Sequence, residues 1–383
     1  MGTWHVFMEA MVVLLLVMPE PSVGRSWWMG NTENLSCPCS RLEWCQPIST
    51  KTEKEVFAFS LRNEESHWEL FDWSKLTTVV MFGYVNQSLM CLAHSHGVRA
   101  VILGEISTSE MVSPSLRKEW VKELLTKISE NFLDGVNFDY ENEVLKNETM
   151  IRDAYTSTVR ETNDALKAVN PNYQVSVDVA WKPNVDSRFF DYPGLANASD
   201  FLFVMAYDEQ SQIFGECVGG PNSDLRSADL GLEIYMRDPA YRIAPSKLVL
   251  GLPWYGYSYE CIQLKGDSCF IKKVPFRGVN CSDAAGRQYD YGLIYEVLMT
   301  MPERYKWNAS SSTPYFTYTD EIYGTTYQVQ FDDPHSLSLK CKLAKQKGLR
   351  GVGMWNIDSL DYTDSATGEH IRSEMFGAFS AFL

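Results

Sequence analysis

Residues 133–141 of the chain read LDGVNFDYE. If this stretch forms a β-strand, its side chains point alternately to two faces of a sheet, because side chains alternate with a period of two along a strand. The apolar members would then cover one face. The polar members would share the other face, namely Asn137, Asp139 and Glu141. The stretch therefore predicts a strand that is packed against apolar neighbours on one side and carries an acidic row on the other.

The acidic row suggests chemistry rather than packing. Successive carboxyl groups on one face lie about 6–7 Å apart, from the rise of a strand. At that spacing each negative charge opposes ionisation of its neighbour, so one carboxyl group can keep a proton near neutral pH and act as an acid. We therefore expect Asp139 and Glu141 to titrate as a coupled pair in a catalytic site, with Asp139 raising the effective pKa of Glu141. The alternative, a solvated acidic edge strand, fits the aromatic and aliphatic alternates poorly.

Strand-like and helix-like segments alternate along the rest of the chain. Eight short β-branched or aromatic runs are candidate strands, namely Glu55–Ser60, Thr77–Phe82, Val98–Leu103, Gly135–Tyr140, Gln174–Ala180, Asp200–Ala206, Lys247–Leu252 and Arg350–Trp355. Amphipathic stretches between them predict helices, most clearly at Ser115–Asn131, Asn147–Val169, Ser223–Met236 and Pro334–Lys347. Eightfold strand–helix alternation predicts an α/β fold, a parallel (β/α)8 TIM barrel.

One connection is too long for this pattern. We assign residues 55–256 to barrel strands 1–7, residues 257–331 to an α+β insertion between strands 7 and 8, and residues 332–383 to the last strand and its helices. The insertion should contain one helix at Ala284–Met301 and lie at the carboxyl ends of the strands, where TIM barrels build active sites. Asp332-Asp333-Pro334 predicts a helix start, with Asp at the N-cap and Pro in the first turn.

The N-terminal region indicates passage through the secretory pathway. Residues 1–24 predict a cleaved signal peptide, and residues 25–54 form a cysteine-containing segment. Six glycosylation sequons occur, at Asn34, Asn86, Asn147, Asn197, Asn280 and Asn308. The nine cysteines favour disulfides with at least one thiol left over, rather than a zinc site built on the first three of them. His94 and His96 are interpreted as satisfied surface or core residues.

The charge balance limits the partners. With 34 basic and 49 acidic residues the net charge is −15, which argues against nucleic acid and anionic membranes. After removal of the signal peptide we expect no membrane association, no metal, no cofactor and a monomer. The abundance of aromatic residues, including 11 Trp and 20 Tyr, fits either a well-packed barrel core or a sugar-binding cleft.

Three further strand ends should meet Glu141 at the carboxyl rim of the barrel. The sixth strand ends in Met205-Ala206-Tyr207-Asp208, the seventh is followed by Trp254-Tyr255, and the eighth ends in Trp355. Carboxylates beside aromatic faces suit a pyranose ring, whose apolar faces stack and whose hydroxyl groups form hydrogen bonds. Asp178 on the fifth strand faces either the barrel interior or a lysine, and is left outside the predicted catalytic set.

These motifs resemble glycoside hydrolase family 18. The pattern D-G-x-D-x-D-x-E at Asp134, M-x-Y-D at Met205 and the Trp at the end of the eighth strand are typical of that family, and the resemblance covers nearly all of the chain after the signal peptide. It implies that Glu141 is the general acid, that Asp139 orients the 2-acetamido group of the substrate, and that Tyr207 binds that group. Asp208, Met205, Trp355 and Tyr255 would bind the sugar. The acetamide oxygen, not an enzyme group, would be the nucleophile, so configuration would be retained.

Asn137 departs from the family pattern, which usually has an Asp there. An Asp could share a proton with the next carboxyl group, whereas an Asn offers only fixed donors and acceptors. Asn137 therefore belongs to the expected catalytic row without the proton relay.

Within the family the similarity favours lysosomal enzymes. These release the reducing-end N-acetylglucosamine by splitting the β-1,4 bond of the di-N-acetylchitobiose core of N-linked glycans. The alternatives are an endo-acting chitinase and a lectin that binds oligosaccharides without cutting them.

Overall fold

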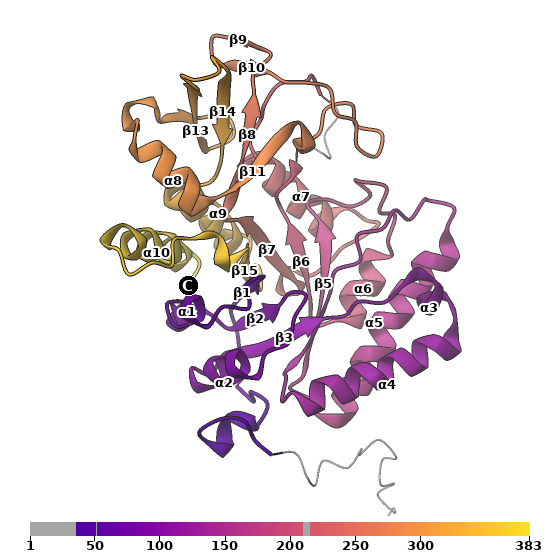
Figure 1. The fold of residues 1–383 in the computed structure, drawn as a ribbon. Coiled ribbons are helices and arrows are strands. Elements are labelled where there is room, and N and C mark those ends of the chain that lie inside the picture. Colours follow the sequence, from indigo (N-terminus) through magenta and orange to yellow (C-terminus); the bar gives the residue numbers. More distant parts are fainter. Residues whose placement is uncertain (1–35, 51, 210–214) are drawn as a thin grey trace, which may run out of the picture. The chain divides into compact units, whose positions relative to one another are not determined.

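The computed structural model describes residues 36–50, 52–209 and 215–383. The predicted signal peptide, residues 1–24, and the sequon at Asn34 lie outside this range. Eight parallel strands close into a barrel in the order β1-β15-β7-β6-β5-β4-β3-β2 (Figure 1). They are β1 Glu55–Ser60, β2 Thr78–Met81, β3 Arg99–Leu103, β4 Gly135–Phe138, β5 Gln174–Ala180, β6 Phe201–Met205, β7 Leu248–Pro253 and β15 Gly351–Trp355. The predicted TIM barrel is confirmed.

Helices connect the strands and cover the outside of the barrel. Their bounds are α1 Glu65–Trp68, α2 Gln87–Ser95, α3 Thr108–Val112, α4 Pro114–Glu130, α5 Thr149–Val169, α6 Tyr192–Ala198, α7 Leu225–Arg237, α9 Pro334–Gln346 and α10 Ala366–Ala378. Helix α9 starts as predicted, since the Asp333 side chain accepts a hydrogen bond from the Ser336 backbone and Pro334 occupies the first turn. None of the described helices is long and apolar enough to cross a membrane.

The insertion between β7 and β15 forms two further sheets. A five-stranded sheet has the order β11-β8-β14-β13-β12, and a hairpin pairs β9 with β10 (Figure 1). The elements are β8 Tyr255–Glu260, β9 Gln263–Lys265, β10 Ser268–Phe270, β11 Gly286–Asp290, α8 Tyr291–Met299, β12 Lys306–Asn308, β13 Thr313–Thr319 and β14 Thr326–Gln330. The sheet thus begins at Tyr255, two residues before the expected boundary at 257.

The helix predicted at Ala284–Met301 is wrong in its first third. Residues Gly286–Asp290 form strand β11, which pairs antiparallel with β8, and only Tyr291–Met299 is helical. The pairing joins segments more than 25 residues apart, so the helical pattern of the local sequence is overridden by a tertiary contact.

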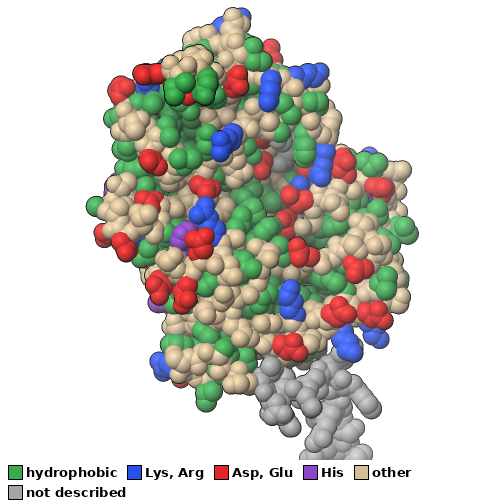
Figure 2. Space-filling model, viewed as in Figure 1, with side chains coloured by type: hydrophobic (Ala, Val, Ile, Leu, Met, Phe, Trp, Pro, Cys, Tyr) green, Lys and Arg blue, Asp and Glu red, His purple; other side chains and the backbone are tan. Residues whose placement is uncertain are grey.

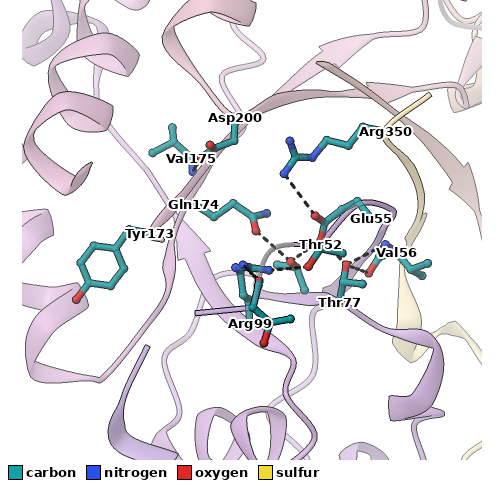
Figure 3. A network of polar contacts seen from close by, with 12 residues as sticks. Thr52, Glu55, Val56, Thr77, Arg99, Tyr173, Gln174, Val175, Asp200 and Arg350 are labelled. Carbon is teal, nitrogen blue, oxygen red and sulfur yellow. Dashed lines mark hydrogen bonds and ion pairs between the residues drawn. The ribbon is translucent and has the colours of Figure 1, made fainter. Parts of the chain in front are cut away.

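The interior of the barrel changes character from one end to the other. At the amino ends of the strands, Glu55 accepts hydrogen bonds from two threonine hydroxyls, with the Arg350 guanidinium 3.9 Å away (Figure 3). Nearby, Thr78 donates to Gln174 at 3.2 Å, and Arg99 donates to the Thr50 carbonyl oxygen at 2.6 Å. This polar network closes the amino-terminal end.

Aromatic rings fill the middle of the barrel. Phe57, Phe59 and Phe203 lie with their ring centroids 5.1–5.6 Å apart. Glycines at 251 and 353 make room for the Phe203 ring, because a Cβ at Gly251 would lie 2.3 Å from it and one at Gly353 would lie 2.6 Å from it. The carboxyl ends of the strands are therefore left to carry the polar and acidic side chains.

The predicted disulfides are confirmed, and there are four of them. They join Cys37 to Cys45, Cys39 to Cys91, Cys217 to Cys281 and Cys261 to Cys269. Cys341 is the buried free thiol among the nine cysteines. The first disulfide closes a loop within the segment 37–45, the second holds that segment to helix α2, and the other two lie in or beside the insertion.

A buried ion pair fixes the same N-terminal segment to the barrel. His94 faces the Trp44 carbonyl oxygen through Nδ1 at 2.6 Å and the Asp134 carboxylate through Nε2 at 2.7 Å. Both partners are acceptors, so both ring nitrogens donate and the imidazole is charged. Asp134 also accepts from the backbone N–H groups of Ile48 and Ala100. The first Asp of the acidic motif is thus structural, and His94 is the satisfied core residue that the sequence suggested.

Candidate active site

The acidic row starts inside β4 and continues beyond its end. The strand stops at Phe138, so Asp139 and Glu141 lie in the connection that follows rather than in the strand. Val136, Phe138 and the residue at 140 are buried in the layer between sheet and helices, as the period of two predicted. Asn137 is fully buried on the interior side, whereas the Glu141 side chain is 50% exposed. The row therefore runs from the barrel interior to its rim.

An arginine that the sequence did not suggest contacts Glu141. Arg188, in the loop between β5 and α6, has a side chain only 7% exposed, and its Nη2 lies 2.7 Å from Glu141 Oε1 and 2.8 Å from Asp186 Oδ2. Arg277 of the insertion pairs with the same Asp186 oxygen at 2.7 Å. Burial lowers the pKa of Arg188, but the charges of Glu141, Asp186 and Asp139 outweigh it and raise that pKa. The guanidinium stays charged beside Glu141.

Asp139 is the carboxyl group of the row that keeps its proton. Burial, then the negative charge of Glu141, raise its pKa from 3.8 to about 7, against the opposing charge of Arg188. Its Oδ1 atom is buried and has no hydrogen-bond partner among the described residues. At mildly acid pH, Asp139 is therefore neutral while Glu141 pairs with a guanidinium.

Asn137 is held rigidly by the neighbouring strand β5. Its Oδ1 accepts from the Ser176 hydroxyl at 2.6 Å, and its Nδ2 donates to Asp178 Oδ2 at 2.7 Å. Asp178 faces the barrel interior, which settles the alternative that the sequence left open. Burial and the charge of Asp139 raise the pKa of Asp178 well above its usual range.

Tyrosine hydroxyls position Asp208. The hydroxyls of Tyr255 and Tyr257 both donate to Asp208 Oδ1, at 2.5 and 2.8 Å, and the Asp208 backbone N–H donates to Asn222 Oδ1 at 2.8 Å. Burial raises the pKa of Asp208, and the two tyrosine hydrogen bonds oppose that shift. Tyr255 is only 2% exposed. Its direct contact is therefore with Asp208, and it offers little ring surface to a sugar.

The other predicted residues border the same place. Tyr207 is buried, and the cause of its strongly raised pKa is burial first and then the charges of the surrounding carboxylates, which include Asp178 and Asp139. Trp355 and Met205 are partly exposed and pack against the inner aromatic cluster. The Trp355 ring lies 5.2 Å from Phe59 and 4.8 Å from the ring of residue 82. All eight predicted site residues thus lie at or near the carboxyl end of the barrel.

The site also contains residues that lay outside the predicted set. Arg188, Asp178 and Tyr257 reach the site from elements distant along the chain from the acidic row. Asp178 had a signal, because Gln174, Ser176 and Asp178 alternate with valines and so had to share a face of β5. Arg188 had none.

Charged side chains of both signs are interspersed on the face in Figure 2, and acidic ones are the more frequent. This agrees with the excess of 49 acidic over 34 basic residues. The face in Figure 2 shows no extended basic surface.

Comparison with known proteins identifies the family. The model of glycosyl hydrolases family 18 matches residues 39–359. The di-N-acetylchitobiase of Rattus norvegicus is 42% identical over 344 residues, which cover 89% of this chain and 92% of that protein. The di-N-acetylchitobiase of Homo sapiens is also 42% identical, over 89% of this chain and 87% of that protein. The group IV chitinase of Ostrinia furnacalis in complex with allosamidin shares the fold, with a TM-score of 0.66, 17% identity, and coverage of 85% of this chain and 98% of that one. The chain therefore belongs to family 18 of the glycoside hydrolases.

Proposed function

We propose that this protein hydrolyses the β-1,4 bond between the two N-acetylglucosamines of the N-glycan core and releases the reducing-end sugar. The observation that carries the proposal is the pair of carboxyl groups after β4, Asp139 protonated and Glu141 at the rim, in a family 18 barrel. The names and near full-length similarity of the curated relatives support this choice of substrate.

The chemistry follows from substrate-assisted catalysis. Glu141, protonated when substrate separates it from Arg188, donates this proton to the glycosidic oxygen as the bond to the anomeric carbon breaks. The acetamide oxygen of the same sugar attacks that carbon to give an oxazolinium ion. Water then adds to the anomeric carbon and returns a proton to Glu141, so configuration is retained. Asp139 and Tyr207 hold the acetamide, and Asn137 supports Asp139.

The sugar-binding roles rest on position and exposure. Trp355, partly exposed above the inner aromatic rings, offers a face to the sugar being cleaved, with Met205 beside it. Asp208 accepts from a sugar hydroxyl or the acetamide, and Tyr255 acts by holding Asp208 rather than by stacking.

We further propose that the protein acts as a monomer in the lysosome after secretory passage, without metal or cofactor. The four disulfides and the neutral Asp139 at mildly acid pH fit such a compartment. Among the sequons, Asn147, Asn197 and Asn280 are exposed, whereas two are partly buried. Of those two, Asn86 caps helix α2 and Asn308 accepts from the Ser310 hydroxyl. We expect the three exposed sites to carry glycans most fully.

The test is incubation at mildly acid pH with a reducing N-acetylglucosamine oligosaccharide and with its borohydride-reduced form, followed by mass spectrometry. Release of single N-acetylglucosamine from the free reducing end alone, absent in Glu141→Gln, is the expected result. Disaccharides from both substrates would indicate an endo-acting chitinase. Binding without cleavage would indicate a lectin, although the presence of both Asp139 and Glu141 disfavours it. A matched oligosaccharide without 2-acetamido groups should not be cleaved.

A further inference from the structure

Asp178 on β5 lies level with Asp139 of the acidic row. The strands β4 and β5 pair in parallel, with Asn137 opposite Ser176 and Phe138 opposite Val177. The next position in this register sets Asp139 beside Asp178, on neighbouring chain segments about 5 Å apart by strand spacing. Because the valines of β5 belong to the outer core, Asp178 must face the interior, where it is only 3% exposed.

The hydrogen bonds around Asn137 leave one oxygen of each carboxyl group open. Asn137 receives the Ser176 hydroxyl at its oxygen and directs its N–H toward Asp178 Oδ2, so it can accept no proton from either aspartate. Asp178 Oδ1 and Asp139 Oδ1 are both buried and have no hydrogen-bond partner within the described residues. Two carboxyl groups, each with one buried oxygen left open, are thus adjacent on the interior side of the barrel.

Electrostatics favours one proton for the two groups. Burial raises the pKa of both, the charge of Asp139 raises the pKa of Asp178 further, and the charge of Glu141 raises that of Asp139. Other titratable groups face Asp178 from the surrounding elements, namely Glu141 after β4, Arg188 after β5, Tyr207 after β6 and Tyr155 on α5. Of these only Arg188 is a cation, and it contacts Glu141 and Asp186.

We infer that Asp178 supplies, from β5, the second carboxyl group that the row lacks at Asn137, and that Asp139 and Asp178 share one proton during the reaction. With the proton on Asp178, Asp139 is an anion and accepts the substrate acetamide N–H while positive charge develops on the oxazolinium ion. With the proton on Asp139, Asp139 is neutral and Asp178 carries the negative charge before substrate binds. The proton moves between two carboxyl oxygens and the pair keeps one proton throughout, so Glu141 alone exchanges a proton with the glycosidic oxygen and water. Asp178 is a positioning residue, because it acts through Asp139.

The inference rests on the proposed function, and the test uses isosteric exchanges. Asp178→Asn removes the second carboxyl group, Asn137→Asp with Asp178→Asn moves it to the position usual in the family, and Asp153→Asn, at a side chain that is 64% exposed, is the control. We expect Asp178→Asn to lower kcat/KM by roughly 100-fold and to move the basic limb of its pH profile to lower pH. The double variant should recover most of the rate, and Asp153→Asn should change it little.

Three results would overturn the inference. One is an Asp178→Asn variant with an unchanged pH profile. The second is an Asp178→Asn variant that fails to fold, since removal of a buried negative charge should not destabilise the protein. The third is a double variant no faster than the single one. A measurement without substrate distinguishes failure of this inference from failure of the proposed function. Relative to the unaltered protein, Asp178→Asn should gain stability as pH rises from 5 to 8, whether or not any oligosaccharide is cleaved.

Discussion

Replacing Asp139 with asparagine should stabilise the folded protein at alkaline pH and abolish its activity. The Asp139 carboxyl group has one buried oxygen and lies beside the negative charge of Glu141, and its pKa is about 7 instead of 3.8. Below pH 4 the carboxyl group is protonated in both the folded and unfolded chains, so it does not change stability. Between pH 4 and 7 the unfolded chain releases the proton and the folded chain retains it. Stability therefore falls as pH rises through this window and stays reduced above it.

The size of the effect follows from the shift. A difference of about three pH units, at about 1.4 kcal/mol for each, gives about 4 kcal/mol as an upper estimate of the stability lost by pH 8. For a chain of this size, that corresponds to a change in Tm of about 5 °C. Asparagine has the same shape and no charge, so Asp139→Asn should be free of this loss.

The assay is urea or thermal unfolding of both proteins at pH 4 and at pH 8. The free energy of unfolding of Asp139→Asn, relative to the unaltered protein, should rise by up to about 4 kcal/mol between the two pH values. Asp153→Asn is the control, because the Asp153 side chain is 64% exposed. Its effect on the free energy of unfolding should differ little between pH 4 and pH 8. A difference between Asp139→Asn and the unaltered protein that stays constant with pH would refute the reasoning.

Three other predictions concern stability and reactivity. His94→Gln should cost about 3 kcal/mol below pH 6.5, because it leaves Asp134 buried without its cation. Burial lowers the pKa of His94, but its hydrogen bond and charge contact with Asp134 raise it overall, so the loss should shrink as pH rises through that raised pKa. Cys341 should react with a thiol reagent only after unfolding, because burial raises its pKa to about 12. Gly353→Ala should destabilise by about 1–3 kcal/mol or more, because the new Cβ would lie 2.6 Å from the Phe203 ring.

Each of these has a simple check. Equal destabilisation of His94→Gln at pH 5 and pH 9 would contradict the ion-pair argument. One equivalent of rapidly reacting thiol in the native protein would show that Cys341 is accessible. Gly377→Ala is the control for Gly353→Ala, since a Cβ there meets nothing within 4 Å, and it should be neutral or slightly stabilising. Similar unfolding midpoints for both alanine variants would be inconsistent with close packing around Phe203.

The barrel could be predicted because the signals for its strands and helices come from residues close together in the sequence. Strand periodicity places β1 and β5 at the bounds that the structure has, Glu55–Ser60 and Gln174–Ala180, and the start of α9 follows from Asp333 and Pro334. Side-chain alternation and capping depend on neighbours a few residues apart, so the sequence carries them directly. The pairing of β11 with β8 depends instead on residues far apart in the chain, and the helix predicted across β11 was wrong.

The barrel, the acidic row and the family could be recognised from the amino-acid sequence. Which group of the row holds a proton and which faces a cation depends on the fold. Arg188 reaches Glu141 from the loop after β5, and Asp178 reaches Asn137 from the neighbouring strand. The physical reason is that a pKa depends on burial and on charges within a few ångströms, and folding brings those charges from elements far apart in the chain.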